Sequence, residues 1–185
     1  MSTSALISVE EYLKQVYEPD AEYVDGEILE RNVGEHDHSR LQMLVADALY
    51  QLEKSYKLHV LTEQRVRVAD TPLRKRYRIP DITVLCEPFE ITRVLLQPPL
   101  AVVEILSPED RMSVMLAKVA DYSQFGIQYI FVVDPAERQL FLADSGGLKT
   151  VQDQILRFTT PSGDIAVDLK PLFADRTLSP SAARC

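Results

Sequence analysis

Three charged side chains stand where the surrounding sequence favours burial. Asp81 opens the apolar stretch IPDITVL, Glu104 interrupts the apolar stretch LAVVEIL, and Lys118 falls within a helical pattern further along the chain. Burying an unpaired charge costs several kcal/mol, even after the surroundings relax. These side chains are therefore expected to compensate one another in a single cleft.

Helical geometry predicts where Lys118 points. At about 100° per residue, Lys118 lies between Tyr122 and Phe125 on the apolar face of its helix. Its stem is then expected to run along that face towards a sheet. A helix that packs back on the strand preceding it can bring this lysine over Glu104.

Two carboxylates and an ammonium in one cleft could hold a divalent cation. Mg²⁺ (or Mn²⁺) binds one or two carboxylates and keeps several waters for substrate phosphates. Such a site can orient a water, lower its pKa and balance charge on a phosphoryl oxygen. Each residue also has a structural interpretation: Asp81 could cap a turn, Glu104 could pair with an arginine, and Lys118 could extend to solvent.

The charge balance limits the kind of nucleic-acid binding that can be expected. With 20 Lys and Arg against 28 Asp and Glu, the net charge of −8 argues against a protein that coats nucleic acid through general phosphate neutralisation. A local basic segment is nevertheless present, and we expect it to receive the phosphate backbone, with a solvated hairpin surface as the alternative. Its cations are Arg65, Arg67, Arg74, Lys75, Arg76 and Arg78.

Hydrophobic periodicity, helix-capping residues and turn residues predict the helices and strands that position these residues. A capping box at Ser8–Glu11 opens a short helix, and Asp25-Gly26 predicts a hairpin. A long helix is expected over 38–56, and a second over 107–126, with Ser107 as N-cap, Pro108 at its first position and Gly126 after its end. Strands are expected at 58–68, 79–85, 100–107, 128–134, 138–144, 148–152, 155–160 and 164–167, before a short helix at Leu172 and Phe173.

A strand, a long helix and a strand between residues 100 and 134 form a βαβ unit, which implies parallel pairing there. The flanking hairpins imply antiparallel pairing elsewhere. The predicted fold is α/β: a mixed sheet flanked by long helices, with additional N-terminal and C-terminal β-hairpins. We expect a single domain over residues 1–175 and a flexible C-terminal tail over 176–185.

The order of the charged residues resembles the PD-(D/E)xK nuclease superfamily, in which Pro-Asp is followed by an acidic strand residue. The usual lysine would stand two positions after Glu104, where this chain has Leu106; Lys118 looks like a migrated version. A closer resemblance, over residues 8–175, is to the Uma-type family of putative restriction endonucleases. It rests on AEYVDGEILE, His38, Arg78 to Asp81, Val103 to Pro108, Lys118 with Tyr122, and Val132 to Pro135.

The resemblance implies a restriction-endonuclease-like fold, a metal at Asp81 and Glu104, and Lys118 as base or electrostatic helper. It also favours supporting roles for Glu22, His38 and Tyr122; Gln64, before the basic segment, is a further candidate. An exposed hairpin acid and a helix-opening histidine are the alternatives for Glu22 and His38. Val114 stands where many members of the family have an acid, which we attribute to surface drift.

The predicted function is a metal-dependent endonuclease that hydrolyses phosphodiester bonds in nucleic acid, most simply DNA, as a homodimer. The alternatives are a catalytically silent nuclease-fold module for binding or assembly, and a phosphoesterase acting on other substrates. Cys86 and Cys185 form no disulfide framework or metal-ligand spacing. With no signal peptide or apolar run of about 20 residues, a cytoplasmic location is expected.

Overall fold

The computed structural model describes residues 6–31 and 35–178. A six-stranded sheet forms its centre, in the order β10-β9-β8-β7-β6-β3. Its strands are β3 (Leu58–Thr62), β6 (Ile82–Cys86), β7 (Ala101–Ile105), β8 (Tyr129–Asp134), β9 (Gln139–Asp144) and β10 (Gly147–Thr150). β7 and β8 are parallel, as predicted for the βαβ unit, and the other neighbouring pairs are antiparallel.

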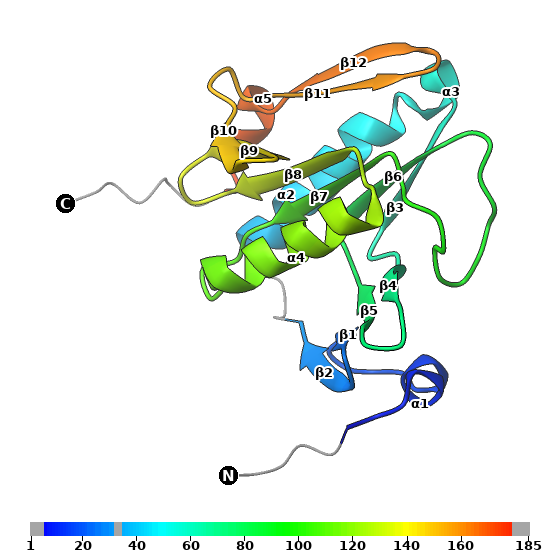
Figure 1. Ribbon diagram of the computed structural model, residues 1–185. Helices are drawn as coiled ribbons and strands as arrows, with labels where there is room; N and C mark the ends of the chain where they lie inside the picture. Colours follow the sequence, from blue (N-terminus) through cyan, green and yellow to red (C-terminus); the bar gives the residue numbers. More distant parts are fainter. Residues whose placement is uncertain (1–5, 32–34, 179–185) are drawn as a thin grey trace.

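A long helix covers each face of this sheet, α2 (His36–Tyr50) behind and α4 (Met112–Phe125) in front in the view of Figure 1. Successive side chains of a strand point to opposite faces. Accordingly, Val103 packs in the same core as Leu41 and Leu49 of α2, whereas Val102 packs with Met115 of α4. The same alternation turns Glu104 towards α4. The predicted fold class is thereby confirmed.

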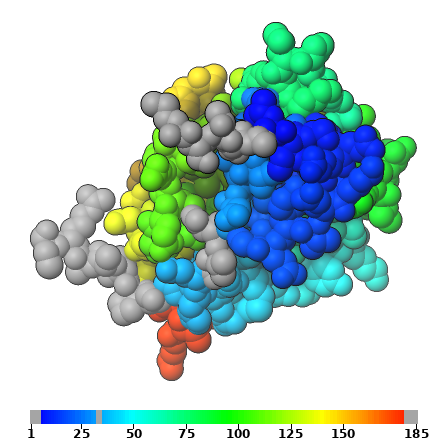
Figure 2. Space-filling view, turned by 90° about the horizontal axis from the view of Figure 1, so that it is seen from below, coloured from blue at the N-terminus to red at the C-terminus, as the bar shows by residue number. Residues whose placement is uncertain are grey.

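A smaller, four-stranded sheet lies beside the large one, in the order β2-β1-β5-β4. Its strands are β1 (Ala21–Val24), β2 (Glu27–Glu30), β4 (Val66–Asp70) and β5 (Lys75–Arg78). The predicted hairpin joins β1 to β2 through Asp25 (φ 52°) and Gly26 (φ 104°), the left-handed pair that a tight two-residue turn requires. Figure 2 shows the blue N-terminal segments beside the green region that includes α4.

Among the remaining elements, the C-terminal segments extend the core on the α2 side, whereas α1 packs through Tyr12 on the smaller sheet. The C-terminal hairpin of β11 (Ile155–Thr160) and β12 (Gly163–Asp168) contributes Leu156 and Phe158 to the same core as α2. The short elements are α1 (Val9–Lys14), α3 (Glu53–Tyr56) and α5 (Lys170–Phe173). Within the described part of the chain, no helix has the length and apolar character needed to cross a membrane.

Two predicted helix boundaries were wrong. The second long helix begins at Met112 and not after Ser107, because the Asp110 carboxylate accepts a hydrogen bond from the Ser107 backbone N–H (2.8 Å) and folds 107–111 into a turn. The first long helix ends at Tyr50, and a separate turn of helix, α3, is followed by Lys57 in a left-handed conformation (φ 54°). Most of the predicted tail, residues 179–185, lies outside the described residues, and the domain division stays a prediction.

Candidate active site

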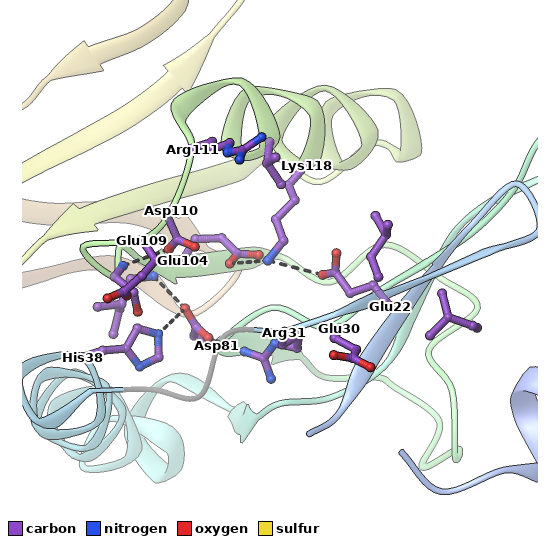
Figure 3. Close-up of a pocket in the computed structure, with 15 residues that line it drawn as sticks. Glu22, Glu30, Arg31, His38, Asp81, Glu104, Glu109, Asp110, Arg111 and Lys118 are labelled. Carbon is purple, nitrogen blue, oxygen red and sulfur yellow. Dashed lines mark hydrogen bonds and ion pairs between the residues drawn. The ribbon is translucent and has the colours of Figure 1, made fainter. Parts of the chain in front are cut away.

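A cleft of about 580 Å³ lies where the two sheets and α4 meet. Its walls come from β1, the end of β2, the start of α2, the residue before β6, the end of β7, the turn at 107–111, and α4. Figure 3 shows Asp81, Glu104 and Lys118 converging there. Asp81, Glu104 and Lys118 come from segments that lie far apart in the sequence, and the fold brings them into one cleft.

Asp81 is held by donors from several elements and is only 2% exposed. Its Oδ2 accepts hydrogen bonds from the Ile105 backbone N–H (2.7 Å) and from His38 Nε2 (3.2 Å), while Oδ1 pairs with Arg31 Nη2 (2.5 Å). Burial raises the pKa of Asp81, but His38, Arg31 and Lys118 outweigh burial, so this pKa lies below its ordinary value. Asp81 is therefore an anion at neutral pH.

Glu104 is equally buried, at 1% exposed, but its surroundings differ. Oε1 accepts a short hydrogen bond from the Tyr122 hydroxyl (2.5 Å), and Oε2 pairs with Lys118 Nζ (2.9 Å). Burial raises the pKa of Glu104 to about 7, against the opposing effect of Lys118. A cation placed beside this carboxylate would favour its ionised form.

Lys118 bridges two acids. Its ammonium lies 2.9 Å from Glu104 Oε2 and 3.3 Å from Glu22 Oε1, and its side chain is 12% exposed. Burial lowers the pKa of Lys118, but Glu104, Glu22 and Asp81 raise it above the ordinary lysine value. Lys118 is consequently protonated at neutral pH, which favours an electrostatic helper over a base.

Glu22 is a buried part of this network, not an exposed hairpin acid. Arg78 Nη1 donates to Glu22 Oε2 (2.7 Å), and the Ile79 backbone N–H donates to Oε1 (3.1 Å). Burial raises the pKa of Glu22, but Lys118, Arg78 and the Ile79 N–H together hold it below its ordinary value. Glu22 therefore anchors Lys118 from the smaller sheet.

Asp121 contacts the site indirectly, because it pairs with Arg78, which pairs with Glu22. The sequence did not identify this residue. Arg74, Arg76 and Arg78 occupy alternate positions on or beside β5, so they share a face, and all three pair with this buried carboxylate. The repeated arginine spacing was the available signal. Alternate arginines on a strand share a face and so could share one acidic partner, but their spacing does not identify that acid.

The other cations of the basic segment also have acidic partners. Arg65 pairs with Asp20, while Arg67 and Lys75 pair with Asp70. These described residues do not line the cleft, and the prediction that the segment receives a phosphate backbone stays a prediction. Two arginines that the sequence analysis did not single out, Arg31 and Arg111, line the cleft instead (Figure 3).

The remaining supporting candidates fall into two groups. His38 and Tyr122 contact Asp81 and Glu104 respectively, as described above. Gln64 lies apart from the cleft lining and donates to the backbone carbonyls of Arg65 and Arg93. The geometry thus separates Gln64 from the residues that contact the two buried acids.

The donor chemistry fits a hydrated divalent cation better than an ion enclosed by protein. Asp81 and Glu104 offer carboxylate oxygens at one cleft, and Mg²⁺ binds one or two carboxylates while retaining several waters. Across residues 6–31 and 35–178, no group of three or more His, Cys, Asp or Glu side chains is arranged to hold a metal ion. All four oxygens of the two acids already accept from protein donors, so a cation would share these oxygens with their donors or displace one of them.

Comparisons with known proteins agree with this architecture. The family model described as "Uma2: Putative restriction endonuclease" matches residues 9–168. A solved structure described as a putative nuclease belonging to DUF820, from Anabaena variabilis ATCC 29413, superposes with a TM-score of 0.74 and 23% identity, covering 91% of this chain and 98% of that one. At this identity the likeness shows the fold alone. No curated protein matches the chain.

Proposed function

Since this chain belongs to the Uma2 family of putative restriction endonucleases, we propose that the protein is a metal-dependent endonuclease. It would hydrolyse phosphodiester bonds in nucleic acid, with DNA as the expected substrate. The observation that carries this proposal is the convergence of Asp81, Glu104 and Lys118 on one cleft. Asp81 and Glu104 are buried, the Lys118 side chain is 12% exposed, and such clusters of ionisable groups are typical of functional sites.

Asp81 and Glu104 would hold Mg²⁺ or Mn²⁺ through their cleft-facing oxygens. When bound, the ion would supply Lewis acidity and lower the pKa of a water. His38 and the Ile105 backbone N–H fix the orientation of Asp81, and the Tyr122 hydroxyl fixes that of Glu104. The protein thereby holds both carboxylates in place before any ion arrives.

Lys118 would balance negative charge that develops on the phosphoryl oxygens. It remains protonated beside Glu104 and Glu22, so it can donate hydrogen bonds but cannot accept a proton from water. A fixed donor in a site sheltered from water stabilises a transition state more strongly than the same donor in solution. We therefore assign Lys118 an electrostatic role.

A catalytically silent binding or assembly module is the second candidate. The ion pairs of Asp81 and Glu104 favour it, because these acids are compensated by protein groups alone. The net charge of −8 and the ion-paired basic segment also favour it. Homodimer formation, which would suit cleavage of two strands, remains part of the proposal.

The test is a cleavage assay on plasmid and single-stranded DNA with Mg²⁺ or Mn²⁺. Wild-type protein is expected to cleave, and Glu104→Gln is expected to lose activity. Asp164→Asn, which alters an exposed carboxylate on the C-terminal hairpin, should retain it. Equal cleavage by wild type and Glu104→Gln would contradict the assignment, and the absence of both cleavage and Mn²⁺ binding would favour the module.

A further inference from the structure

Arg31 contributes a positive charge to the cleft directly beside Asp81. It follows β2, and its backbone N–H donates to the Asp20 carbonyl (3.0 Å). Its side chain is 15% exposed and reaches Asp81 Oδ1 with Nη2 (2.5 Å), while Nη1 lies 3.6 Å from Glu63 Oε1. Figure 3 shows the guanidinium at Asp81, on the side of the cleft opposite α4.

The contacts of Asp81 differ between its two oxygens. Oδ2 is held by the Ile105 backbone N–H and by His38, so that oxygen is fixed by the strand and by α2. Oδ1 accepts from Arg31, a long side chain at the end of an edge strand of the smaller sheet. Of the contacts around Asp81, the one with Arg31 can therefore break with the least rearrangement of the backbone.

Lys118 is a less suitable group to move. It lies on a long helix and contacts both Glu104 and Glu22, so its departure would leave two buried acids without this cation. Arg31, by contrast, could keep the Glu63 carboxylate as a partner after leaving Asp81.

We propose that Arg31 is an exchangeable counter-ion, whose guanidinium compensates Asp81 in the metal-free protein and leaves Oδ1 when a divalent cation binds. This inference rests on the proposed function, because it concerns the same metal site. It explains how Asp81 remains compensated without metal, while Lys118 compensates Glu104. It also implies that the ion competes with Arg31, so the protein binds metal more weakly than its carboxylates alone would allow.

Calorimetric titration with Mn²⁺ tests the competition. Arg31→Gln is expected to bind Mn²⁺ about tenfold more tightly than wild type, because it removes a competing charge from the site. Arg31→Lys keeps that charge and should bind like wild type. Arg65→Gln is the matched control: the Arg65 side chain is also 15% exposed and ion-paired, but it does not line the cleft, so Mn²⁺ affinity should be unchanged.

A second measurement uses the wild-type protein and does not depend on the folding of any variant. In a ¹⁵N spectrum of arginine side chains, the Arg31 Nε–H signal should move when Mg²⁺ is added, while the Arg65 signal should stay in place. A stationary Arg31 signal in Mg²⁺-saturated protein would overturn the proposal.

The two proposals fail in distinguishable ways. If wild type and Arg31→Gln bind Mn²⁺ equally, or the variant binds more weakly, Arg31 is not a competitor, although metal-dependent cleavage can still stand. An equal gain in Arg65→Gln would also overturn the inference. If neither wild type nor Arg31→Gln binds Mn²⁺, the metal-dependent function fails together with the counter-ion.

Discussion

At the scale of the residue, Asp81 and Glu104 are two buried acids with different electrostatic surroundings. Burial raises the pKa of each, but the donors and cations around Asp81 reverse that effect, whereas those around Glu104 do not. Separation of the pKa values of neighbouring groups is typical of sites that move protons. The two carboxylates therefore differ in their tendency to hold a proton near neutral pH.

Replacing Lys118 by methionine should abolish most cleavage. Loss of one fixed donor to a developing charge lowers turnover by about 100-fold or more, and Lys118→Arg should retain part of the activity because it keeps the charge. The measurement is single-turnover cleavage at saturating Mg²⁺. Full activity of Lys118→Met would exclude the electrostatic role.

Replacing Glu22 by glutamine should destabilise the protein by about 3 kcal/mol at pH 7, because Arg78 and Lys118 would lose a buried anionic partner. The pKa of Glu22 is lowered on folding, so its ionised form contributes stability above the unfolded-state pKa near 4.5. That contribution is lost as pH falls from about 4.5 through the lowered folded-state value. Urea unfolding at pH 7 and pH 3 measures the difference in free energy of unfolding between wild type and Glu22→Gln. This difference should be smaller at pH 3, and an equal difference at both pH values would contradict the linkage.

The meeting of Asp81, Glu104 and Lys118 in one cleft was predictable because each conflicts with its local sequence pattern. The roles of Arg31 and Asp121 could not be predicted, because nothing in their local sequence conflicts with an exposed position. Arg31 follows a hairpin strand, and Asp121 lies on an amphipathic helix. Their partners come from distant segments, Asp81 for Arg31 and β5 for Asp121. Such tertiary pairings cannot be obtained from spacing alone.

At the scale of the element, α4 connects the two sheets through the site. It packs on the large sheet through Met115 and Val119, and it pairs with β5 of the smaller sheet through Asp121. The helix therefore holds Lys118 between Glu104 of one sheet and Glu22 of the other. Its position controls the geometry of the cleft.

Replacing Asp121 by asparagine should destabilise the protein by about 3 kcal/mol, because the buried Arg78 and its neighbours Arg74 and Arg76 would lose a common anion. The measurement is the free energy of unfolding by chemical denaturation. Asp164→Asn is the control, because loss of its exposed carboxylate should change this free energy little. Equal stability of the two variants would show that the arginines do not depend on Asp121.

Replacing Gly126 by alanine should destabilise the protein by about 1 kcal/mol. Gly126 ends α4 at φ 98°, which alanine adopts only with strain, whereas a Cβ there would meet Pro98 Cγ at an ordinary 3.7 Å. The cost is therefore expected to come from the backbone. Ser113→Ala, at an exposed position of the same helix, is the control; an unchanged melting temperature for Gly126→Ala would contradict the argument.

Most elements were predictable because their signals are local. Hydrophobic periodicity indicated the two long helices, Asp25-Gly26 indicated the hairpin, and Gly126 indicated the end of α4. The start of α4 was predicted at Ser107 and not at Met112, because Ser107 and Pro108 match the usual pattern of an N-cap followed by proline. The turn closed by Asp110 competes with that pattern, and its formation was not evident from the sequence.

At the scale of the whole molecule, the cleft exists only where the two sheets meet. The large sheet supplies Glu104, the smaller sheet supplies Glu22, and Asp81 lies on the connection from β5 to β6. Among the described residues, six acidic side chains against three arginine and lysine side chains line the cleft, which favours attraction of a cation before a polyanion. We therefore expect nucleic-acid binding to depend on metal.

The metal site is tested most directly by a crystal structure of the protein soaked in Mn²⁺, with the anomalous signal of the ion measured. We expect an anomalous peak in the cleft, bound by carboxylate oxygens of both Asp81 and Glu104, with Lys118 beside it. A fully occupied Mn²⁺ elsewhere, or no peak in the cleft at saturating Mn²⁺, would show that Asp81 and Glu104 do not form the metal site.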